Sequence, residues 1–477
     1  MLEIFRSFWI VFVAVIYILG VIAALEAIWK GRTAQGSIAW VISLIIFPYL
    51  ALPLYWIFGD RKFYGYVSAR RSGDLKINHI ANDLTENLRN KNLVMQQDSS
   101  EFRVMEYLAG MPFTTQNNAN LLINGNVAFK EIFSSIESAQ DYILIQFYMI
   151  LNDNLGNQLK ELLIKKTYQG VRIFVLYDEI GSYKLSKQYV EELRDKGVQI
   201  YSFKTHKRLK YRFRLNFRNH RKIVIIDGKT AFVGGMNVGD KYLGIHPKFG
   251  FWRDTQIKIE GPAVQCIQVP FITDWYWVTK KVPDLSWTQR LPAAGTNNIL
   301  ALPSGPADEN ETCGMFFVHI INSATKRLWI VSPYFVPDQP VLNALQLAAM
   351  RGVDVKLIIP AKSDLLLTYL SSFSYLKEIT DTGVEVYRYQ KGYLHQKVML
   401  IDDKLSVVGT ANLDNRSFRI NFEINIISYD SDFAVSVEQM LQKDLEDSIQ
   451  VDETDYSKRP LWFKLAVKSS RLLAPIQ

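Results

Sequence analysis

Residues 219–227 read Asn-His-Arg-Lys-Ile-Val-Ile-Ile-Asp, and residues 394–402 read Leu-His-Gln-Lys-Val-Met-Leu-Ile-Asp. Both stretches have the form H-x-K-x4-D, and each is followed by a glycine-containing loop that ends in asparagine, at residues 234–237 and 409–412. One such pattern arises by chance in roughly a few per cent of chains of this length. Two copies at the same place in an internal repeat are therefore improbable as a coincidence.

The two stretches close two copies of a longer repeat. For example, residues 170–176 (Gly-Val-Arg-Ile-Phe-Val-Leu) recur as residues 352–358 (Gly-Val-Asp-Val-Lys-Leu-Ile). Amphipathic helices alternate with short apolar strands throughout, which predicts an α/β fold with helices covering a sheet. We expect two duplicated halves, at residues 111–290 and 291–477.

Two apolar segments precede the repeat. Residues 8–25 and 36–59 are uncharged runs of 18 and 24 residues, close to the ~20 residues that cross a bilayer as a helix. We expect two transmembrane helices within residues 1–60 and a juxtamembrane connector at residues 61–110. A cleaved signal peptide is the alternative for the first segment. Lysine and arginine are more frequent at the outer ends than in the connecting loop, which favours a cytoplasmic catalytic region.

Composition favours an anionic partner. The net charge is +8 and the pI about 9.1, which suits nucleic acid, an anionic membrane surface or a phosphate-bearing substrate. Residues 203–222 interleave aromatic and basic side chains, a pattern that fits a nucleic-acid backbone, anionic headgroups or a solvated loop. Cys266 and Cys313 are the two cysteines, too few for a disulfide framework or a cysteine metal cluster. We expect neither a metal nor a cofactor.

The repeated motif suits phosphate chemistry. In an extended strand, residues i and i+2 point to the same face, so each motif presents an imidazole beside an ammonium. One histidine would attack phosphorus, and the other would protonate the leaving alcohol and deprotonate the incoming one. The pattern leaves open which is the nucleophile, and we place it on His220, with His395 as acid and base. Four side chains would hold the non-bridging oxygens: Lys222, Lys397, Asn237 and Asn412.

The duplicated motif with its glycine–asparagine loop resembles the phospholipase D superfamily over about residues 111–477. This resemblance implies two α-β-α sandwich halves around one pseudo-twofold active site, and a phosphohistidine intermediate. It also implies a carboxylate that orients each histidine: Glu423, 28 residues after His395, in the second half, and Asp254 in the first. Asp227 and Asp402 complete the motifs and belong to the candidate catalytic set, although we expect them to organise turns rather than perform chemistry.

The superfamily contains lipases, phosphatidyl transferases and nucleases. The N-terminal hairpin followed by two halves, with Pro-Tyr-Phe-Val-Pro-Asp at residues 333–338, resembles the bacterial cardiolipin synthase family. That resemblance implies a multi-pass protein of the bacterial inner membrane. Its partners would be phosphatidylglycerol and anionic membrane lipids, not nucleic acid, and the reaction would convert two phosphatidylglycerol molecules into cardiolipin and glycerol.

Three alternatives stay open. The first two are a membrane-anchored phospholipase D hydrolase and a nuclease of the same superfamily. The third, a lipid-binding scaffold with inactive motifs, is disfavoured because both His-Lys pairs are intact. Phosphatidylethanolamine in place of the second phosphatidylglycerol, the acyl preference and the oligomeric state are not determined by the sequence.

Overall fold

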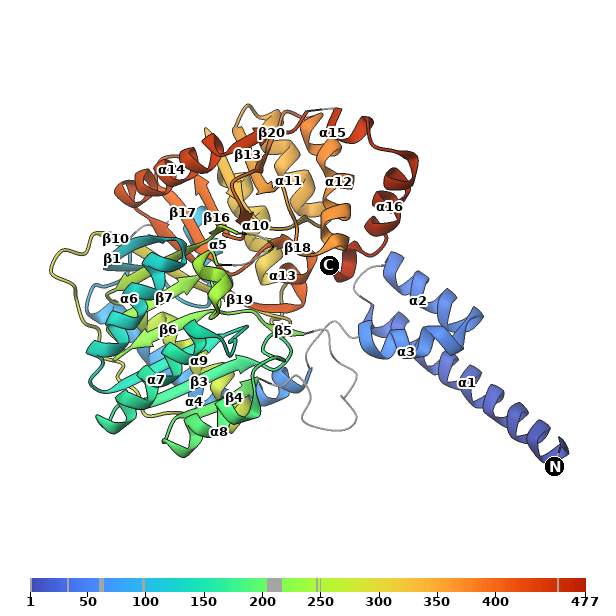
Figure 1. Cartoon of the computed structure of the whole chain (residues 1–477), viewed down its shortest axis with the longest axis horizontal. Coiled ribbons are helices and arrows are strands. Elements are labelled where there is room, and N and C mark those ends of the chain that lie inside the picture. The colour runs from blue at the N-terminus through green and yellow to red at the C-terminus, as the bar shows by residue number, and fades with distance from the viewer. Residues whose placement is uncertain are drawn as a thin grey trace. The chain divides into compact units, whose positions relative to one another are not determined.

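A computed structural model shows two compact units (Figure 1). The first comprises Met1–Tyr64 and Lys204–Phe217, and the second comprises Gly65–Phe203 and Arg218–Gln477. The second unit contains both H-x-K motifs. The residues that the structure describes are 2–31, 34–59, 64–96, 99–203, 217–245, 248, 250–452 and 454–477.

The first unit contains three apolar helices: α1 (Leu2–Lys30), α2 (Ala34–Ile46) and α3 (Pro48–Phe58). Small side chains of α1, including Ala23 and Ala27, pack against Leu44 and Leu52. Most of the remaining α1 surface exposes large apolar side chains, as a helix in contact with lipid would. With 29 residues, α1 is roughly 44 Å long. Among the described residues, it is the one helix long and apolar enough to cross a membrane.

The second predicted span is not a single helix. The chain leaves helical geometry at Phe47, where φ is −128° and ψ is 57°, and α3 begins at Pro48. Proline has no amide hydrogen, and its ring clashes with the preceding turn, so it ends α2 rather than kinking it. The two pieces of 13 and 11 residues are roughly 20 and 17 Å long, short of the ~30 Å hydrocarbon core. The second predicted span is therefore divided into two shorter helices, and its passage through the bilayer stays a prediction.

Two helices occupy the predicted connector: α4 (Tyr64–Asn90) and α5 (Ser100–Ala109). Leu84 and Leu88 of α4 belong to the same apolar cluster as strands of both halves. Phe102 and Met105 of α5 pack in a second cluster. This segment is therefore part of the core of the second unit.

One 16-stranded sheet runs through the second unit: 15 strands follow one order, and the short strand β5 (Arg218–Asn219) lies off this path. In the first half, read outward from the middle, the order is β1 (Thr114–Ile123), β9 (Thr255–Glu260), β7 (Thr230–Gly234), β6 (Ile223–Ile226), β2 (Tyr142–Phe147), β3 (Arg172–Asp178) and β4 (Gln199–Phe203). In the second half it is β10 (Asn297–Ser304), β19 (Asn421–Tyr429), β17 (Leu405–Gly409), β16 (Val398–Ile401), β11 (Arg327–Val331), β13 (Asp354–Pro360), β14 (Glu385–Tyr389) and β20 (Ser448–Gln450). Apart from β20, the two orders match strand for strand, and antiparallel pairing of β1 with β10 joins them. The duplicated α/β fold predicted from the repeat is confirmed.

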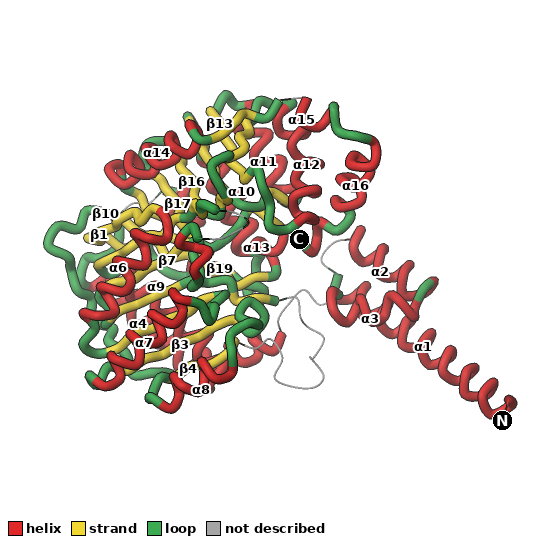
Figure 2. Tube along the Cα trace, viewed as in Figure 1, coloured by secondary structure: helices red, strands yellow, loops and turns green. Residues whose placement is uncertain are grey.

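Helices cover both faces of the sheet (Figure 2). One group comprises α6 (Asn124–Ser138), α7 (Asn154–Tyr168), α8 (Lys187–Asp195), α10 (Thr312–Ser323), α11 (Gln339–Met350) and α12 (Leu366–Thr380). On the other face, α9 (Ala263–Thr279) and α14 (Ser431–Glu446) share one apolar cluster with strands of both halves. All residues of β2, β6 and β16 are buried, as strands covered on both faces must be.

The remaining elements are short. They are β5 (Arg218–Asn219), η2 (Asp240–Leu243), β8 (Trp252–Arg253), β12 (Phe335–Val336), β15 (Tyr393–Leu394), β18 (Leu413–Asp414), α13 (Asn415–Arg419), α15 (Thr454–Ser457), α16 (Leu461–Arg471) and η3 (Ala474–Ile476). Two of these strands, β5 and β15, lead directly into the catalytic histidine candidates.

Candidate active site

Each H-x-K motif begins on a strand that pairs with the opposite half. β5 runs parallel to β19, with Asn219 opposite Phe422, and the backbone N–H of His220 donates to the carbonyl of Phe422 over 2.9 Å. β15 runs parallel to β8, with Leu394 opposite Arg253. The backbone N–H of His395 donates to the carbonyl of Arg253 over 2.8 Å. These two ladders hold the halves together at the start of both motifs.

The histidine–carboxylate pairs are crossed between the halves. Nδ1 of His220 lies 2.9 Å from both carboxylate oxygens of Glu423, and Nδ1 of His395 lies 2.8 Å from Oδ2 of Asp254. The expectation that each carboxylate orients the histidine of its own half is wrong. The strand register causes the crossed pairing. In each parallel pair of strands, the last paired residue is followed by a histidine on one strand and by a carboxylate on the other. Each imidazole thus keeps Nε2 for the reacting phosphate.

The lysines of both motifs lie in the same buried site. Nζ of Lys222 donates to the backbone carbonyl of His220 over 2.6 Å, and Nζ of Lys397 donates to that of His395. Burial lowers the pKa of Lys397 to about 8 and that of Lys222 well below its usual value. Glu423 partly opposes the effect of burial on Lys222, and the ammonium group of Lys397 lowers the pKa of Lys222 further. An anion between them would relieve this cost, so the site is organised to receive a phosphate.

The two carboxylates have different surroundings. Glu423 accepts hydrogen bonds from Thr410 Oγ1 (2.6 Å), Ser417 Oγ (3.0 Å) and Asn421 Nδ2 (3.1 Å). Burial opposes its ionisation, but His220, Lys222 and Thr410 outweigh burial and lower its pKa. Burial raises the pKa of Asp254 to about 6. At the position equivalent to Thr410, the first half has Gly235, where a Cβ atom would lie 2.1 Å from Asp254 Oδ1.

Burial of His220 predicts a pH-dependent stability. Its side chain is 12% exposed, and burial lowers its pKa from 6.5 to about 4. As the pH falls from about 7 to about 5, the unfolded chain binds a proton that the folded chain does not, so folding loses about 2 kcal/mol. We expect His220→Gln to show a smaller drop in melting temperature over this range than the unaltered protein in detergent.

The control for this measurement is His79→Gln, because the His79 side chain is 75% exposed. Its melting temperature should fall with pH as much as that of the unaltered protein. An equal fall in all three proteins would contradict the buried, neutral state of His220.

Asn237 and Asn412 lie in the loops after the motifs, and both are buried. Oδ1 of Asn237 accepts from the backbone N–H of Met149, and its Nδ2 donates to the Tyr242 hydroxyl. Nδ2 of Asn412 donates to Asp414. An amide nitrogen carries two hydrogens, so each asparagine keeps one N–H that could donate to a phosphate oxygen. Binding of phosphate oxygens by these residues stays a prediction.

Asp227 and Asp402 have structural surroundings. The Asp227 carboxylate accepts from the backbone N–H groups of Gln140, Asp141 and Tyr142. In the same way, Asp402 accepts from residues 325–327 at the start of β11. Both have a positive φ, 52° and 50°, and follow the ends of β6 and β16 that lie farther from the histidines. Both carboxylates thus hold backbone groups at their turns, and a part in the chemistry stays a prediction.

Sequence reasoning missed two acidic residues, on α9 and α14, that bind side chains within or beside the motifs. The guanidinium of Arg221 donates to Asp274 on α9 over 2.9 Å and also to the carbonyl of Glu423. In the second half, Gln396 and Arg253 both donate to Asp444 on the equivalent helix, α14. Asp274 is the one charged residue of its helix, which was a usable signal, whereas Asp444 lies in an amphipathic helix and gave none.

The basic side chains expected to meet an anionic partner between residues 204 and 216 lie outside the described residues. Arg218, at the end of that stretch, precedes Asn219 on β5.

Comparison with known proteins places this geometry in a family. The sequence matches the family described as "Cardiolipin synthase, PLD-like domain" over residues 132–255 and 317–445, one range on each side of the β1–β10 junction. The chain belongs to this family. Its relatives include proteins named Cardiolipin synthase A from Pseudomonas putida strain KT2440, 46% identical and covering 97% of this chain and 96% of that one, and from Pseudomonas entomophila strain L48, 45% identical with 97% of each covered.

A solved structure shares the fold. Phosphatidylserine synthase from Haemophilus influenzae aligns with a TM-score of 0.60 at 16% identity, over 80% of this chain and 100% of that one. At this identity the likeness concerns the fold alone. The shared fold agrees with the duplicated strand order of the sheet described above.

Proposed function

We propose that this member of the cardiolipin synthase family transfers a phosphatidyl group from one phosphatidylglycerol molecule to another, giving cardiolipin and glycerol. The observation that carries the proposal is 46% identity, over 97% of the chain, to a protein named Cardiolipin synthase A. The site supports it, because both histidines are paired with carboxylates and two buried lysines lie beside them.

In the first step, Nε2 of His220 attacks the phosphorus of the donor lipid. The P–N bond forms, the P–O bond to glycerol breaks, and His395 gives its Nε2 proton to the departing glycerol oxygen. A phosphorylated imidazole carries positive charge, so it needs an ionised partner at Nδ1. Glu423, with three other hydrogen-bond donors and a lowered pKa, meets this need better than Asp254. This difference favours His220 as the nucleophile.

In the second step, a headgroup hydroxyl of the second phosphatidylglycerol gives its proton to Nε2 of His395 and attacks phosphorus. The new P–O bond forms, the P–N bond to His220 breaks, and cardiolipin leaves. Lys222 and Lys397 stabilise the negative charge on the non-bridging oxygens in both transition states. Asp254 holds the His395 imidazole in the tautomer that accepts the proton at Nε2.

We place the protein in the bacterial inner membrane with α1 as its anchor. α2 and α3 both pack against α1, and we propose that together they return through the bilayer as a broken second pass. This arrangement leaves the catalytic unit on the cytoplasmic side, where the positive flanking residues favour it. Phosphatidylglycerol and other anionic lipids are then its partners.

Purified protein supplied with labelled phosphatidylglycerol in mixed micelles tests the function. We expect cardiolipin and glycerol in equal amounts, because each transfer releases one glycerol. Phosphatidic acid as the only lipid product would overturn the synthase and favour the hydrolase. Cleavage of single-stranded DNA without any lipid turnover would favour the nuclease.

A further inference from the structure

A cluster of hydroxyl groups around one carboxylate lies beside His395. Tyr393 precedes this histidine by two residues, and their ring centroids are 5.9 Å apart. The Tyr393 hydroxyl donates to Asp364 Oδ1 over 2.7 Å, and the Tyr334 hydroxyl lies 2.9 and 3.0 Å from the two oxygens of the same carboxylate. We call Asp364, Tyr334 and Tyr393 the Asp364 cluster. The mechanism above uses none of its members.

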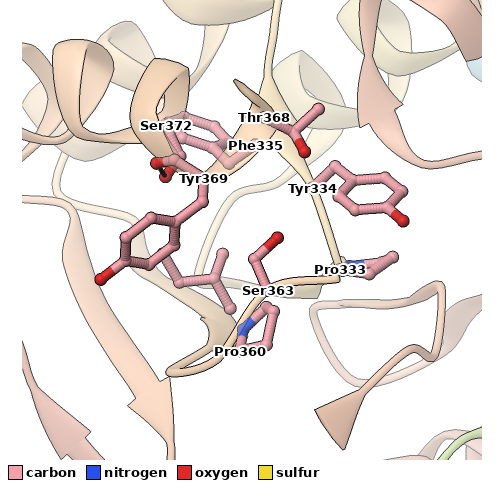
Figure 3. Close-up of a pocket in the computed structure, with 9 residues that line it drawn as sticks. Pro333, Tyr334, Phe335, Pro360, Ser363, Thr368, Tyr369 and Ser372 are labelled. Carbon is pink, nitrogen blue, oxygen red and sulfur yellow. Dashed lines mark hydrogen bonds between the residues drawn. The ribbon is translucent and has the colours of Figure 1, made fainter. Parts of the chain in front are cut away.

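The cavity that Tyr334 helps to line is too small to hold the headgroup of a lipid. Figure 3 shows that cavity, with the rings of Tyr334 and Tyr369 extending in opposite directions. The cavity has a volume of about 10 Å³, which admits about one water molecule. A ligand of the Asp364 cluster must therefore bind outside this cavity, at the solvent-exposed carboxylate of Asp364.

The two ends of the active site differ in charge. Tyr148 of the first half corresponds to Tyr334 in the repeat, and its ring lies 5.2 Å from that of His220. One carboxylate, Asp178, and two guanidinium groups, those of Arg218 and Arg416, act electrostatically on Tyr148, so cations outnumber carboxylates around it. At the other end, Asp364 is close enough to His395 to oppose the lowering of its pKa that burial causes, while Lys241, which also interacts with Asp364, adds to that lowering. The carboxylate repels a phosphate, whereas the carboxylate and hydroxyl oxygens together suit a neutral ligand with several hydroxyl donors.

The geometry points to the Asp364 cluster as a glycerol subsite: Asp364 and Tyr334 bind the glycerol headgroup of phosphatidylglycerol next to His395. The oxygen that leaves in the first step and the oxygen that attacks in the second both exchange a proton with His395, so one subsite serves both. Leu365, Leu366 and Leu367, which are 51%, 72% and 39% exposed, follow Asp364 and offer apolar surface for the remainder of the lipid. This inference rests on the proposed function and adds the residues that select glycerol over water.

The test compares Asp364→Asn with the unaltered full-length protein. Two quantities are measured: the ratio of cardiolipin to phosphatidic acid made from phosphatidylglycerol, and the KM for free glycerol in the reverse reaction with cardiolipin. Loss of a charge-assisted hydrogen bond should lower the ratio about tenfold and raise the KM for glycerol about tenfold. Tyr334→Phe, which removes one hydroxyl, should move both in the same direction by about threefold.

The matched control is Asp381→Asn, because Asp381 is an exposed acid just after the end of α12 that pairs with Lys377. It should leave both quantities unchanged. An unchanged ratio and KM in Asp364→Asn would overturn the subsite. If Asp364→Asn does not fold, an unchanged ratio and KM in Tyr334→Phe would overturn the subsite. Unaltered protein that makes no cardiolipin would instead overturn the proposed function, and the subsite with it.

Discussion

His220→Ala is expected to abolish phosphatidyl transfer, with kcat lowered roughly 10⁴-fold or more. The imidazole forms the covalent bond to phosphorus, and alanine offers no replacement. Water cannot take over efficiently, because its activation depends on the same two histidines. Steady-state turnover of phosphatidylglycerol would show the loss, but it would show the same loss for His395→Ala. A second substrate is needed to separate the two roles.

A phosphatidyl ester of p-nitrophenol makes that separation, because p-nitrophenolate leaves without a proton. His395→Ala should therefore release about one equivalent of p-nitrophenolate and then stop, leaving a phosphatidyl group on His220 that mass spectrometry detects. His220→Ala should give no burst. A burst in His220→Ala and none in His395→Ala would reverse the assignment of the nucleophile.

His319→Ala provides a matched control for this pair of variants. Its Nε2 bonds to the backbone carbonyl of Glu101, between α10 and α5. It should retain full turnover on both substrates. A burst in both active-site variants would refute the mechanism in which the two histidines divide the work.

The duplicated fold was predictable because its signals are local. Glycine turns, short apolar strands and the H-x-K-x4-D spelling recur in order along the chain, and each needs only its own neighbours to form. The matching strand orders of the two halves follow from that repeat. The turn role of Asp227 was also accessible, since the residue lies between two short apolar runs.

The break at Pro48 was less predictable. Proline within an apolar segment either kinks a membrane helix or ends it, and the outcome depends on whether neighbouring groups satisfy the freed backbone. Phe47 leaves helical geometry, with ψ at 57°, so here the helix ends. The sequence contains the proline but not the conformation of the residue before it.

The crossed carboxylates could not be predicted from spacing in the sequence. Glu423 is 203 residues from His220, and Asp254 is 141 residues from His395. Both pairings depend on the register of two-residue strands that meet only after the halves have packed together. Proximity along the chain suggested Glu423 for His395, and the tertiary register reverses that choice.

The crossed pairing leads to the second prediction, in which two carboxylate variants differ in their effect on the p-nitrophenolate burst. Glu423→Gln removes the negative charge that holds the proton on Nδ1 of His220, and its amide NH2 group can donate to Nδ1 instead. The imidazole then shifts to the tautomer whose Nε2 is protonated and cannot attack. We expect the p-nitrophenolate burst to slow by roughly 10³-fold. Asp254→Asn disturbs His395 in the same way, but the burst needs no general acid and should persist.

Steady-state turnover of phosphatidylglycerol should fall in both variants, because the complete cycle needs both histidines. The burst therefore distinguishes them. If each carboxylate acted on the histidine of its own half, Asp254→Asn would lose the burst and Glu423→Gln would keep it. Thr410→Ala adds a graded case, since it removes one donor to Glu423 and leaves the carboxylate in place. Its burst rate should lie between those of Glu423→Gln and the unaltered protein, because Glu423 then counters the positive charge on His220 less effectively.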